Sequence, residues 1–155
     1  MRYIISAVSL VAAIGLLSAG TAFAASTGGS SNTQDTAEKL ERAEQLIKDG
    51  SPSEAVPVLQ KVVESDADNA DAYNYLGFAY RNLGEYDKSK KYYDRALEID
   101  ADHRGAREYL GELYLKLDKL PAARQQLARL DEICGYGCSE YEELKAAIDE
   151  YQQSQ

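Results

Sequence analysis

The two cysteines of the chain, Cys134 and Cys138, are the residues whose type and spacing could most directly do chemistry. An even number of cysteines at short spacing predicts a disulfide when the compartment is oxidising. The sequence between them, Gly-Tyr-Gly, contains two glycines that let the backbone turn back on itself. Closing so short a loop should stabilise the folded state by about 2 kcal/mol. We therefore interpret the pair as a structural disulfide that fixes the last helix to the preceding ones.

The same pair has an alternative interpretation as a thiol-redox or Cu(I) site, because soft thiolate ligands select Cu(I). The only histidine of the chain, His103, is the only candidate for a third ligand. We interpret His103 as a plain surface residue in a turn. Periplasmic proteins that hold copper through Cys-x3-Cys resemble thioredoxin, and this sequence lacks the alternation of strands and helices that such a fold requires. We therefore predict no metal and no cofactor.

The carboxylates of residues 64–71 alternate as they would in a calcium-binding loop that begins at Asp66. That loop requires glycine at its sixth position and glutamate at its twelfth, where this chain has Asp71 and Gly77. We interpret the run as a turn whose aspartate and asparagine cap the next helix, and residues 100–103 as its second copy. No nucleophile stands beside His103 with a triad-like local sequence, so we predict that the chain is not an enzyme.

The charge of the chain limits its partners. With 17 basic and 26 acidic residues its formal net charge is −9, and its isoelectric point is about 4.6. Nucleic acids and anionic membranes reward clusters of lysine and arginine, which are not seen in this sequence. We therefore predict no nucleic-acid partner and no membrane association after export. A cationic partner remains compatible with the composition.

The start of the chain has the three parts of a secretory signal peptide. Arg2 is the positive region, residues 4–17 form the apolar run, and residues 22–24, Ala-Phe-Ala, form the cleavage site. The apolar run is shorter than the roughly 18 residues that a membrane span needs. We predict a mature chain that begins at Ala25 and stays in the bacterial periplasm, with secretion beyond it as the alternative.

From residue 36 onward, apolar residues recur at helical spacing in pairs of helices separated by short turns. The clearest pair has the frame Tyr73-x2-Leu76-Gly77-x2-Tyr80, followed by Gly84, Ser89, Tyr93 and Ala96. A forward shift of about 34 residues, which we call the repeat period, places on the same positions Arg107, Leu110, Gly111, Tyr114, Asp118, Ala123, Leu127 and Leu130. The same shift backward gives a weaker copy: Lys39, Arg42, Ala43, Leu46, Gly50, Ala55, Leu59 and Val62. Large residues of one helix that fill the space beside small residues of the other indicate antiparallel pairs.

This repeating pattern and its period resemble the tetratricopeptide repeat family. The resemblance implies an all-α fold, a right-handed superhelical array of three helix–turn–helix repeats with a C-terminal capping helix. The predicted segments are a signal peptide (1–24), a flexible linker rich in serine, threonine and glycine (25–35), a degenerate first repeat (36–69), a second repeat (70–103), a third repeat that ends in the Cys-x3-Cys turn (104–138), and a capping helix with its tail (139–155).

Two helix starts carry special residues. Pro57 lies far enough into the second helix of the first repeat to remove a backbone hydrogen bond, so we predict a kink or a late helix start there. Ser139 and Glu142 are spaced as a capping box at the start of the last helix. We expect that helix to cover the apolar end of the third repeat; a detachable switch helix is the alternative.

The resemblance also implies that the first helix of each repeat lines a groove that binds a partner. Carried over to the second and third repeats, the groove positions predict these partner-binding residues: Asp71, Asn74, Phe78, Arg81, Glu108, Glu112 and Leu115. Phe78 is suited to anchor a partner side chain, unless a neighbouring helix packs against it. The cations that hold a C-terminal carboxylate in the best-known groove of the family are mostly missing here, which disfavours that mode of binding.

Together these observations predict a non-enzymatic interaction scaffold or adaptor of the bacterial cell envelope, which binds a peptide or partner protein in its groove. The alternative function is a periplasmic thiol-redox or Cu(I)-handling factor that uses Cys134 and Cys138.

Overall fold

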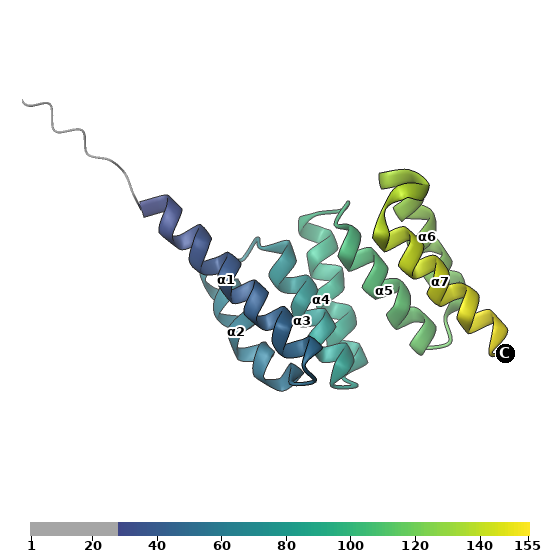
Figure 1. Cartoon of the computed structure of the whole chain (residues 1–155), viewed down its shortest axis with the longest axis horizontal. Helices are drawn as coiled ribbons and strands as arrows, with labels where there is room; N and C mark the ends of the chain where they lie inside the picture. The colour runs from purple at the N-terminus through teal and green to yellow at the C-terminus, as the bar shows by residue number, and fades with distance from the viewer. Residues whose placement is uncertain (1–27) are drawn as a thin grey trace, which may run out of the picture.

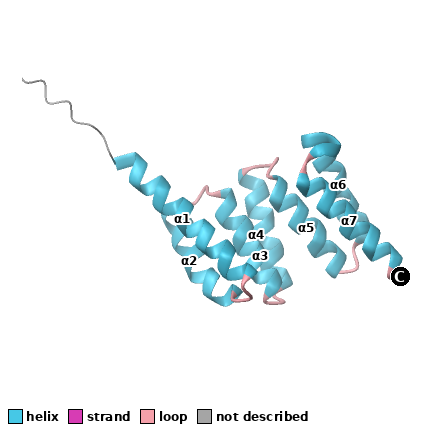
Figure 2. Ribbon diagram, in the orientation of Figure 1, coloured by secondary structure: helices cyan, strands magenta, loops and turns pink. Residues whose placement is uncertain are grey.

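The computed structural model describes residues 28–155, so the predicted signal peptide and the first residues of the predicted linker lie outside the described part. Within that part the chain forms α-helices and one short 3-10 helix, without a strand (Figure 2). The elements are α1 (Gly28–Lys48), α2 (Pro52–Ser65), α3 (Ala70–Asn82), α4 (Tyr86–Ile99), α5 (Arg104–Lys116), α6 (Leu120–Cys134), η1 (Gly135–Gly137) and α7 (Ser139–Gln153). The all-α fold class predicted from the sequence is confirmed.

The helices lie in two layers (Figure 1). In the view of Figure 1, α1, α3, α5 and α7 form the nearer layer, and α2, α4 and α6 lie behind them. Consecutive helices form the pairs α1–α2, α3–α4 and α5–α6, and the second helix of each pair packs against the next helix of the nearer layer. Because α7 contacts both α5 and α6, it occupies the place that the first helix of a fourth pair would take. We call the side formed by α1, α3, α5 and α7 the odd-helix face.

The same turn joins the two helices of every pair. Its left-handed residue is Gly50 (φ 81°), Gly84 (φ 75°) or Asp118 (φ 58°). The following residue donates its backbone N–H to a carbonyl near the helix end: Ser51 to Leu46 (2.8 Å), Glu85 to Tyr80 (2.9 Å) and Lys119 to Tyr114 (2.8 Å). Such a bond ends helices in the Schellman motif. Aspartate tolerates the left-handed region better than most residues, and the Tyr151 hydroxyl of α7 donates to the Asp118 carboxylate (3.0 Å).

Two glycines set the distance between neighbouring helices. A Cβ at Gly77 of α3 would lie 2.5 Å from the Tyr93 ring of α4, and a Cβ at Gly111 of α5 would lie 2.5 Å from Leu144 of α7. Tyr93 and Leu144 are completely buried. The Ser89 hydroxyl donates to the Gly77 carbonyl (2.8 Å) and holds the same contact from the α4 side. Large side chains therefore pack against glycine at both contacts.

The helix starts differ from the sequence-based expectations in the first pair. Residues 28–35 belong to α1 rather than to a linker, because a helix that already has a packed part extends at little cost. An ion pair between Lys39 and Asp35 supports this exposed turn. α2 begins at Pro52 and continues through Pro57, so the expected late start is wrong. Pro57 lies on the exposed side of α2, where water can reach the carbonyl group that its ring leaves unpaired.

The start of α7 also differs from its prediction. Cys138 occupies the N-cap position without a side-chain cap bond, and Ser139 is the first helical residue, so the expected capping box is wrong. The cysteine stands there because Cys134 and Cys138 form a disulfide, with Cα atoms 5.9 Å apart. Cys138 is buried in the apolar cluster that includes Tyr141 and Leu144. The disulfide thus links the end of α6 to the start of α7. None of the described helices is long and apolar enough to span a membrane.

Replacing Gly77 by alanine tests the close contact between α3 and α4. The new Cβ would overlap the buried Tyr93 ring, so we expect the free energy of unfolding to fall by about 2 kcal/mol. Gly137→Ala is the control, because a Cβ at Gly137 has nothing within 4 Å. Urea denaturation should show a change below about 0.5 kcal/mol for the control. Equal midpoints for the two variants would contradict the packing described above.

Candidate functional site

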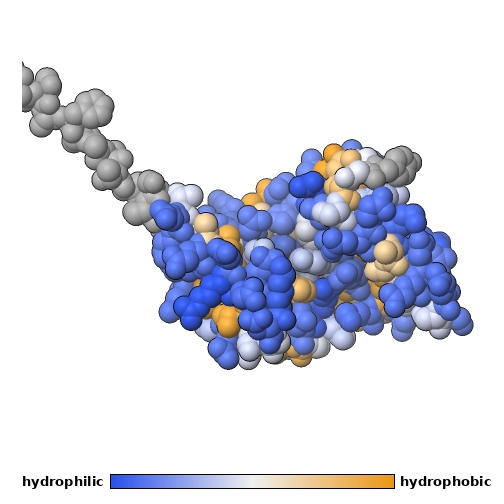
Figure 3. All heavy atoms as spheres, viewed as in Figure 1, coloured by the Kyte–Doolittle hydropathy of each residue, from blue (hydrophilic) through white to orange (hydrophobic). Residues whose placement is uncertain are grey.

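The seven partner-binding residues predicted from the sequence all lie on α3 or α5, but they differ in exposure. Asp71 is exposed, while Phe78 and Glu112 are half-buried. The other four are buried: Asn74 is 5% exposed, Arg81 9%, Glu108 4% and Leu115 8%. The odd-helix face as a whole is mostly hydrophilic (Figure 3). Because four of the seven are buried, most of the predicted residues pack against other parts of this chain and offer little surface to a partner.

Phe78 packs inside the contact between α3 and α5. Its ring stacks on Tyr109 of α5, with centroids 4.8 Å apart and planes inclined by 11°. The Arg81 guanidinium lies 5.1 Å from the Phe78 ring and 5.2 Å from the Tyr109 ring. Arg81 also forms an ion pair with Glu112. Because a guanidinium is attracted both by aromatic faces and by a carboxylate, this group holds α3 against α5. Phe78 is therefore packed against a neighbouring helix, which was the alternative to its role as an anchor for a partner side chain.

His103 joins two turns of the array. Its Nδ1 accepts the backbone N–H of Ala106 (3.1 Å) and caps α5. Because Nδ1 is an acceptor, the ring proton is on Nε2, which donates to Asp71 Oδ1 of α3 (3.0 Å). This hydrogen bond lowers the pKa of Asp71 below its usual range. The interpretation of His103 as a plain surface residue is wrong. The capping role of His103 could have been predicted from its position one repeat period after Asn69. The Asn69 side chain caps α3 as predicted (2.9 Å).

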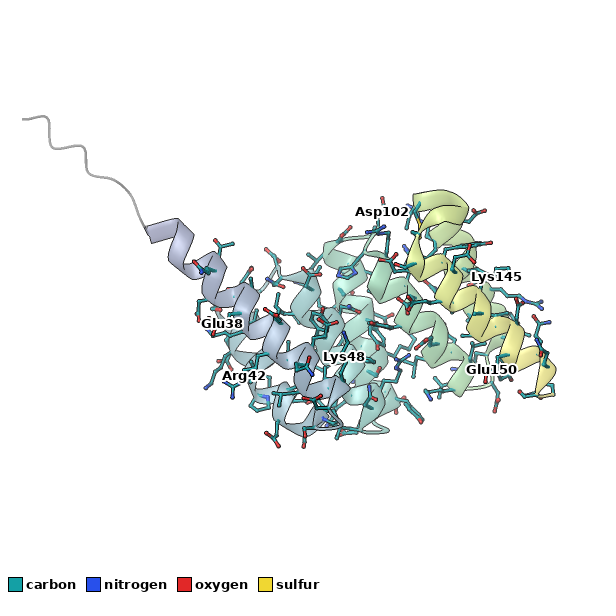
Figure 4. The ribbon with its side chains drawn as sticks, in the orientation of Figure 1. Glu38, Arg42, Lys48, Asp102, Lys145 and Glu150 are labelled. Carbon is teal, nitrogen blue, oxygen red and sulfur yellow. A yellow bond between two sulfur atoms is a disulfide. The ribbon has the colours of Figure 1, made fainter. Side chains whose placement is uncertain are left out.

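A pocket of about 480 Å³ opens between the first turns of α3, α5 and α7. Its lining residues are Asp71, Asn74, Tyr75, Asp100, Asp102, His103, Arg104, Gly105, Glu108, Tyr109, Ser139, Glu140 and Glu143. Carboxylates outnumber the single guanidinium of Arg104 in this lining six to one. Figure 4 labels Asp102 in the turn before α5, beside the upper ends of α5 and α6. We call this hollow the acidic pocket.

The acidic pocket brings together only some of the predicted residues, namely Asp71, Asn74 and Glu108. Glu112 and Leu115 instead line a second hollow of about 390 Å³, which they share with the later turns of α7. The contribution of α7 to both hollows was not predicted from the sequence, where that helix was expected only to cover the third repeat. The available signal was spacing: Leu144 and Ile148 stand one repeat period after Leu110 and Tyr114.

Glu108 is the most perturbed acid of the pocket. Burial, followed by the charges of Glu143 and Glu112, raises its pKa to about 8, although the Arg81 guanidinium opposes this shift. Near neutral pH the Glu108 carboxyl therefore keeps a proton, and the nearby Glu143 of α7 contributes to the raised pKa.

Asn74 occupies the position one repeat period before Glu108. Its Oδ1 is buried and has no hydrogen-bond partner among the described residues. Its Nδ2 lies 3.3 Å from the place where a Cβ of Gly105 would stand, so the glycine makes room for the amide. A buried acceptor without a donor costs about 1–3 kcal/mol. The arrangement therefore leaves one unmet acceptor in the wall of the acidic pocket.

Residues 70–103 match the family model described as tetratricopeptide repeat. This segment of the chain is therefore similar to a tetratricopeptide repeat. The match falls on α3, α4 and the turn that follows them, which is where the sequence period is clearest. A comparison with curated proteins gives no match.

Solved structures of tetratricopeptide repeat domains share this fold. The first such domain of Spaghetti (RPAP3), bound to the HSP90 peptide SRMEEVD, has a TM-score of 0.66 at 19% identity, over 77% of this chain and 97% of that chain. The second domain of human RPAP3, in complex with the HSP70 peptide SGPTIEEVD, has a TM-score of 0.65 at 17% identity, over 78% and 98%. The Yersinia enterocolitica type III secretion chaperone SycD, in complex with a peptide of the translocator YopD, has a TM-score of 0.63 at 19% identity, over 76% and 88%.

Glu108→Gln tests the proton on Glu108. The folded protein holds this proton with a pKa of about 8, whereas an unfolded chain releases it with a pKa of about 4.3. Between these values the unfolded state binds fewer protons, so this group lowers the stability of the wild type as the pH rises. Glutamine keeps the shape without the titration. We expect equal stability near pH 4 and an advantage of the variant of about 1 kcal/mol or more at pH 8.5.

Urea denaturation at a series of pH values measures this difference, with the exposed Glu142→Gln as the control for removal of one charge from the same region. A difference between Glu108→Gln and the wild type that stays constant over the whole pH range would contradict the assignment of the proton.

Proposed function

We propose that the chain is a non-enzymatic interaction module of the bacterial cell envelope, which binds a peptide or a partner protein on the odd-helix face. The acidic pocket is the observation that carries this proposal. Side chains from α3, α5 and α7 converge on it, and its wall contains a buried acceptor without a donor among the described residues. Such convergence of polar groups in a hollow of about 480 Å³ is typical of a binding site.

The structural neighbours support a peptide or protein as the ligand. RPAP3 domains are solved with peptides from HSP90 and HSP70, and SycD is solved with a peptide of YopD. The HSP90 and HSP70 peptides end in Glu-Glu-Val-Asp. An acidic end of that kind would be repelled by the acidic pocket, whose carboxylates outnumber its guanidinium groups. We therefore infer a partner segment of different charge for this chain.

The envelope location is supported by the start of the sequence. Residues 1–24 combine a positive start, an apolar run and a cleavage site, so we propose export and cleavage before Ala25. The disulfide between Cys134 and Cys138 fits an oxidising compartment.

The alternative function, a redox or Cu(I)-handling factor, finds less support. Both ring nitrogens of His103 are used in hydrogen bonds, one to Ala106 and one to Asp71. Its imidazole is therefore occupied in the packing of α3 against α5 rather than open as a third metal ligand. Cys138 is 7% exposed, which limits access of a thiol-exchange partner to its sulfur.

Intact-mass spectrometry of the protein purified from the periplasm tests export and the disulfide together. We expect a chain that begins at Ala25 and gains no mass when a thiol-alkylating reagent is added without reductant. After reduction, two alkyl groups should be added, one on each cysteine. A full-length chain with residues 1–24 intact, or alkylation without reductant, would contradict the proposal.

Site-specific photocrosslinking in living cells tests the binding face. We would place p-benzoylphenylalanine at Tyr75, which lines the acidic pocket on α3, and at the exposed Gln125 of α6 as the control. We expect a defined protein adduct from Tyr75 and none from Gln125. Adducts of equal yield at both positions, or none at Tyr75, would contradict binding on the odd-helix face.

A further inference from the structure

We propose that the acidic pocket is a specificity pocket for one cationic side chain, a lysine or an arginine of the bound partner. This inference rests on the proposed function, because it names the chemistry of the segment that the odd-helix face binds. It commits to a protein side chain as the source of the cation. A free polyamine has the same charge chemistry and is a separate arm of the experiment.

Asn74 supplies the first observation. The residue lines the acidic pocket and is 5% exposed, and its Oδ1 has no hydrogen-bond partner among the described residues. A side-chain carbonyl accepts hydrogen bonds and cannot donate them, so the missing group must carry N–H or O–H. The head groups of lysine and arginine carry donors only. A cationic head group that reached this oxygen would satisfy it without leaving a new acceptor unpaired.

The pairing of the carboxylates supplies the second observation. Four acids of the pocket already have cationic or hydrogen-bonding partners: Asp71 with His103 (3.0 Å), Asp100 with the backbone N–H of Asp102 (2.9 Å), Asp102 with Arg129 (2.6 Å) and Glu140 with Arg104 (3.6 Å). Glu108 and Glu143 instead line the pocket from α5 and α7, and the charge of Glu143 raises the pKa of Glu108. Two such carboxyl groups need either a shared proton or a cation between them. The pocket is thus arranged for one positive charge at this place.

The size and walls of the pocket fit a long side chain. Its volume of about 480 Å³ lies within the range of about 300–1,000 Å³ that is usual for ligand pockets. Tyr75 and Tyr109 contribute aromatic groups to the lining. Lysine and arginine have apolar stems that pack along such groups while the charged end is bound elsewhere. Arg104, the arginine of the pocket, is half-exposed and pairs with Glu140. Its charge therefore does not neutralise Glu108 or Glu143.

Entry of the cation should displace the proton of Glu108. The carboxyl group becomes a carboxylate and its proton goes to the solvent, so the pocket exchanges one positive charge for another. The groups that face Glu108 are Glu143 of α7, Glu112 of its own helix and Arg81 of α3. Because the proton must leave, binding of the cation should tighten as the pH rises toward 8.

The experiment titrates the full mature chain with Nα-acetyl-arginine methylamide and follows nitrogen-15 NMR spectra, including the side-chain amide of Asn74. The matched probe is Nα-acetyl-citrulline methylamide, which has nearly the same shape and no charge. We expect the arginine derivative to bind about tenfold more tightly than the citrulline derivative and to shift the Asn74 amide signal. Calorimetry at pH 7 in two buffers of different ionisation enthalpy should show release of about one proton for each bound arginine derivative.

Two neighbouring acids of α7 give a matched pair of variants. Both residues are exposed, but Glu143 lines the acidic pocket and Glu142 lies outside its lining. Both changes to glutamine remove one charge from the same helix. We expect Glu143→Gln to weaken binding of the arginine derivative about five- to tenfold and Glu142→Gln to weaken it less than about twofold. Glu108→Gln should weaken binding and abolish proton release, which a purely structural role would not predict.

Several results would overturn the proposal. One is equal affinity of the arginine and citrulline derivatives; another is equal weakening by Glu142→Gln and Glu143→Gln, which would mean attraction to the general negative field. Spermidine that shifts the Asn74 amide signal while the arginine derivative does not would make a free polyamine the occupant. A photocrosslink at Tyr75 without any cation effect would remove this inference and leave the proposed function standing. Cation binding without the crosslink would leave the acidic pocket as a cation site and would contradict a protein partner on the odd-helix face.

Discussion

The close approach of helices at two glycines is the constraint on which the rest of the structure depends. At Gly77 the Tyr93 ring of α4 lies where a side chain would be, and at Gly111 the Leu144 side chain of α7 does. These contacts hold α3 against α4 and α5 against α7, while the stacked group around Arg81 joins α3 to α5. As a result, the first turns of three helices come near enough to share one hollow. The acidic pocket is therefore a product of packing density in the core.

The regular part of the fold could be predicted from the sequence because it depends on local chemistry. Gly50 and Gly84 have the left-handed conformation that ends a helix, and the recurrence of apolar residues at the repeat period indicates which helices pair. Asp118 occupies the same position in the third pair and has the same left-handed conformation, so the turn also forms without glycine. Pro57 shows the limit of a local rule, because α2 passes through a residue that disfavours helices once its exposed side accommodates the proline.

The candidate site could be predicted only in part, because its geometry depends on distances between repeats. The residues predicted as groove positions lie on α3 and α5, yet no local signal in the sequence indicates that Phe78 and Arg81 already contact the next helix. The same holds for His103, whose link to Asp71 spans one repeat. The buried state of Glu108 depends on α7, a helix that sequence reasoning treated as a cover. Contacts between repeats decide these roles, and the sequence pattern describes each repeat separately.

The final helix, α7, contributes to the candidate site as well as to the packing of the array. α7 has the spacing of a first helix and the neighbours of one, and its Glu140 and Glu143 form part of the acidic pocket. The site therefore belongs to a junction between a full repeat and a terminal half-repeat. If a repeat were inserted by duplication ahead of α7, the insert would face α5 with its own residues and would carry Glu140 and Glu143 away from Glu108. On the proposed function, a change in the number of repeats would therefore alter the charge and shape of the pocket, because α7 both packs against α5 and supplies part of the proposed recognition surface.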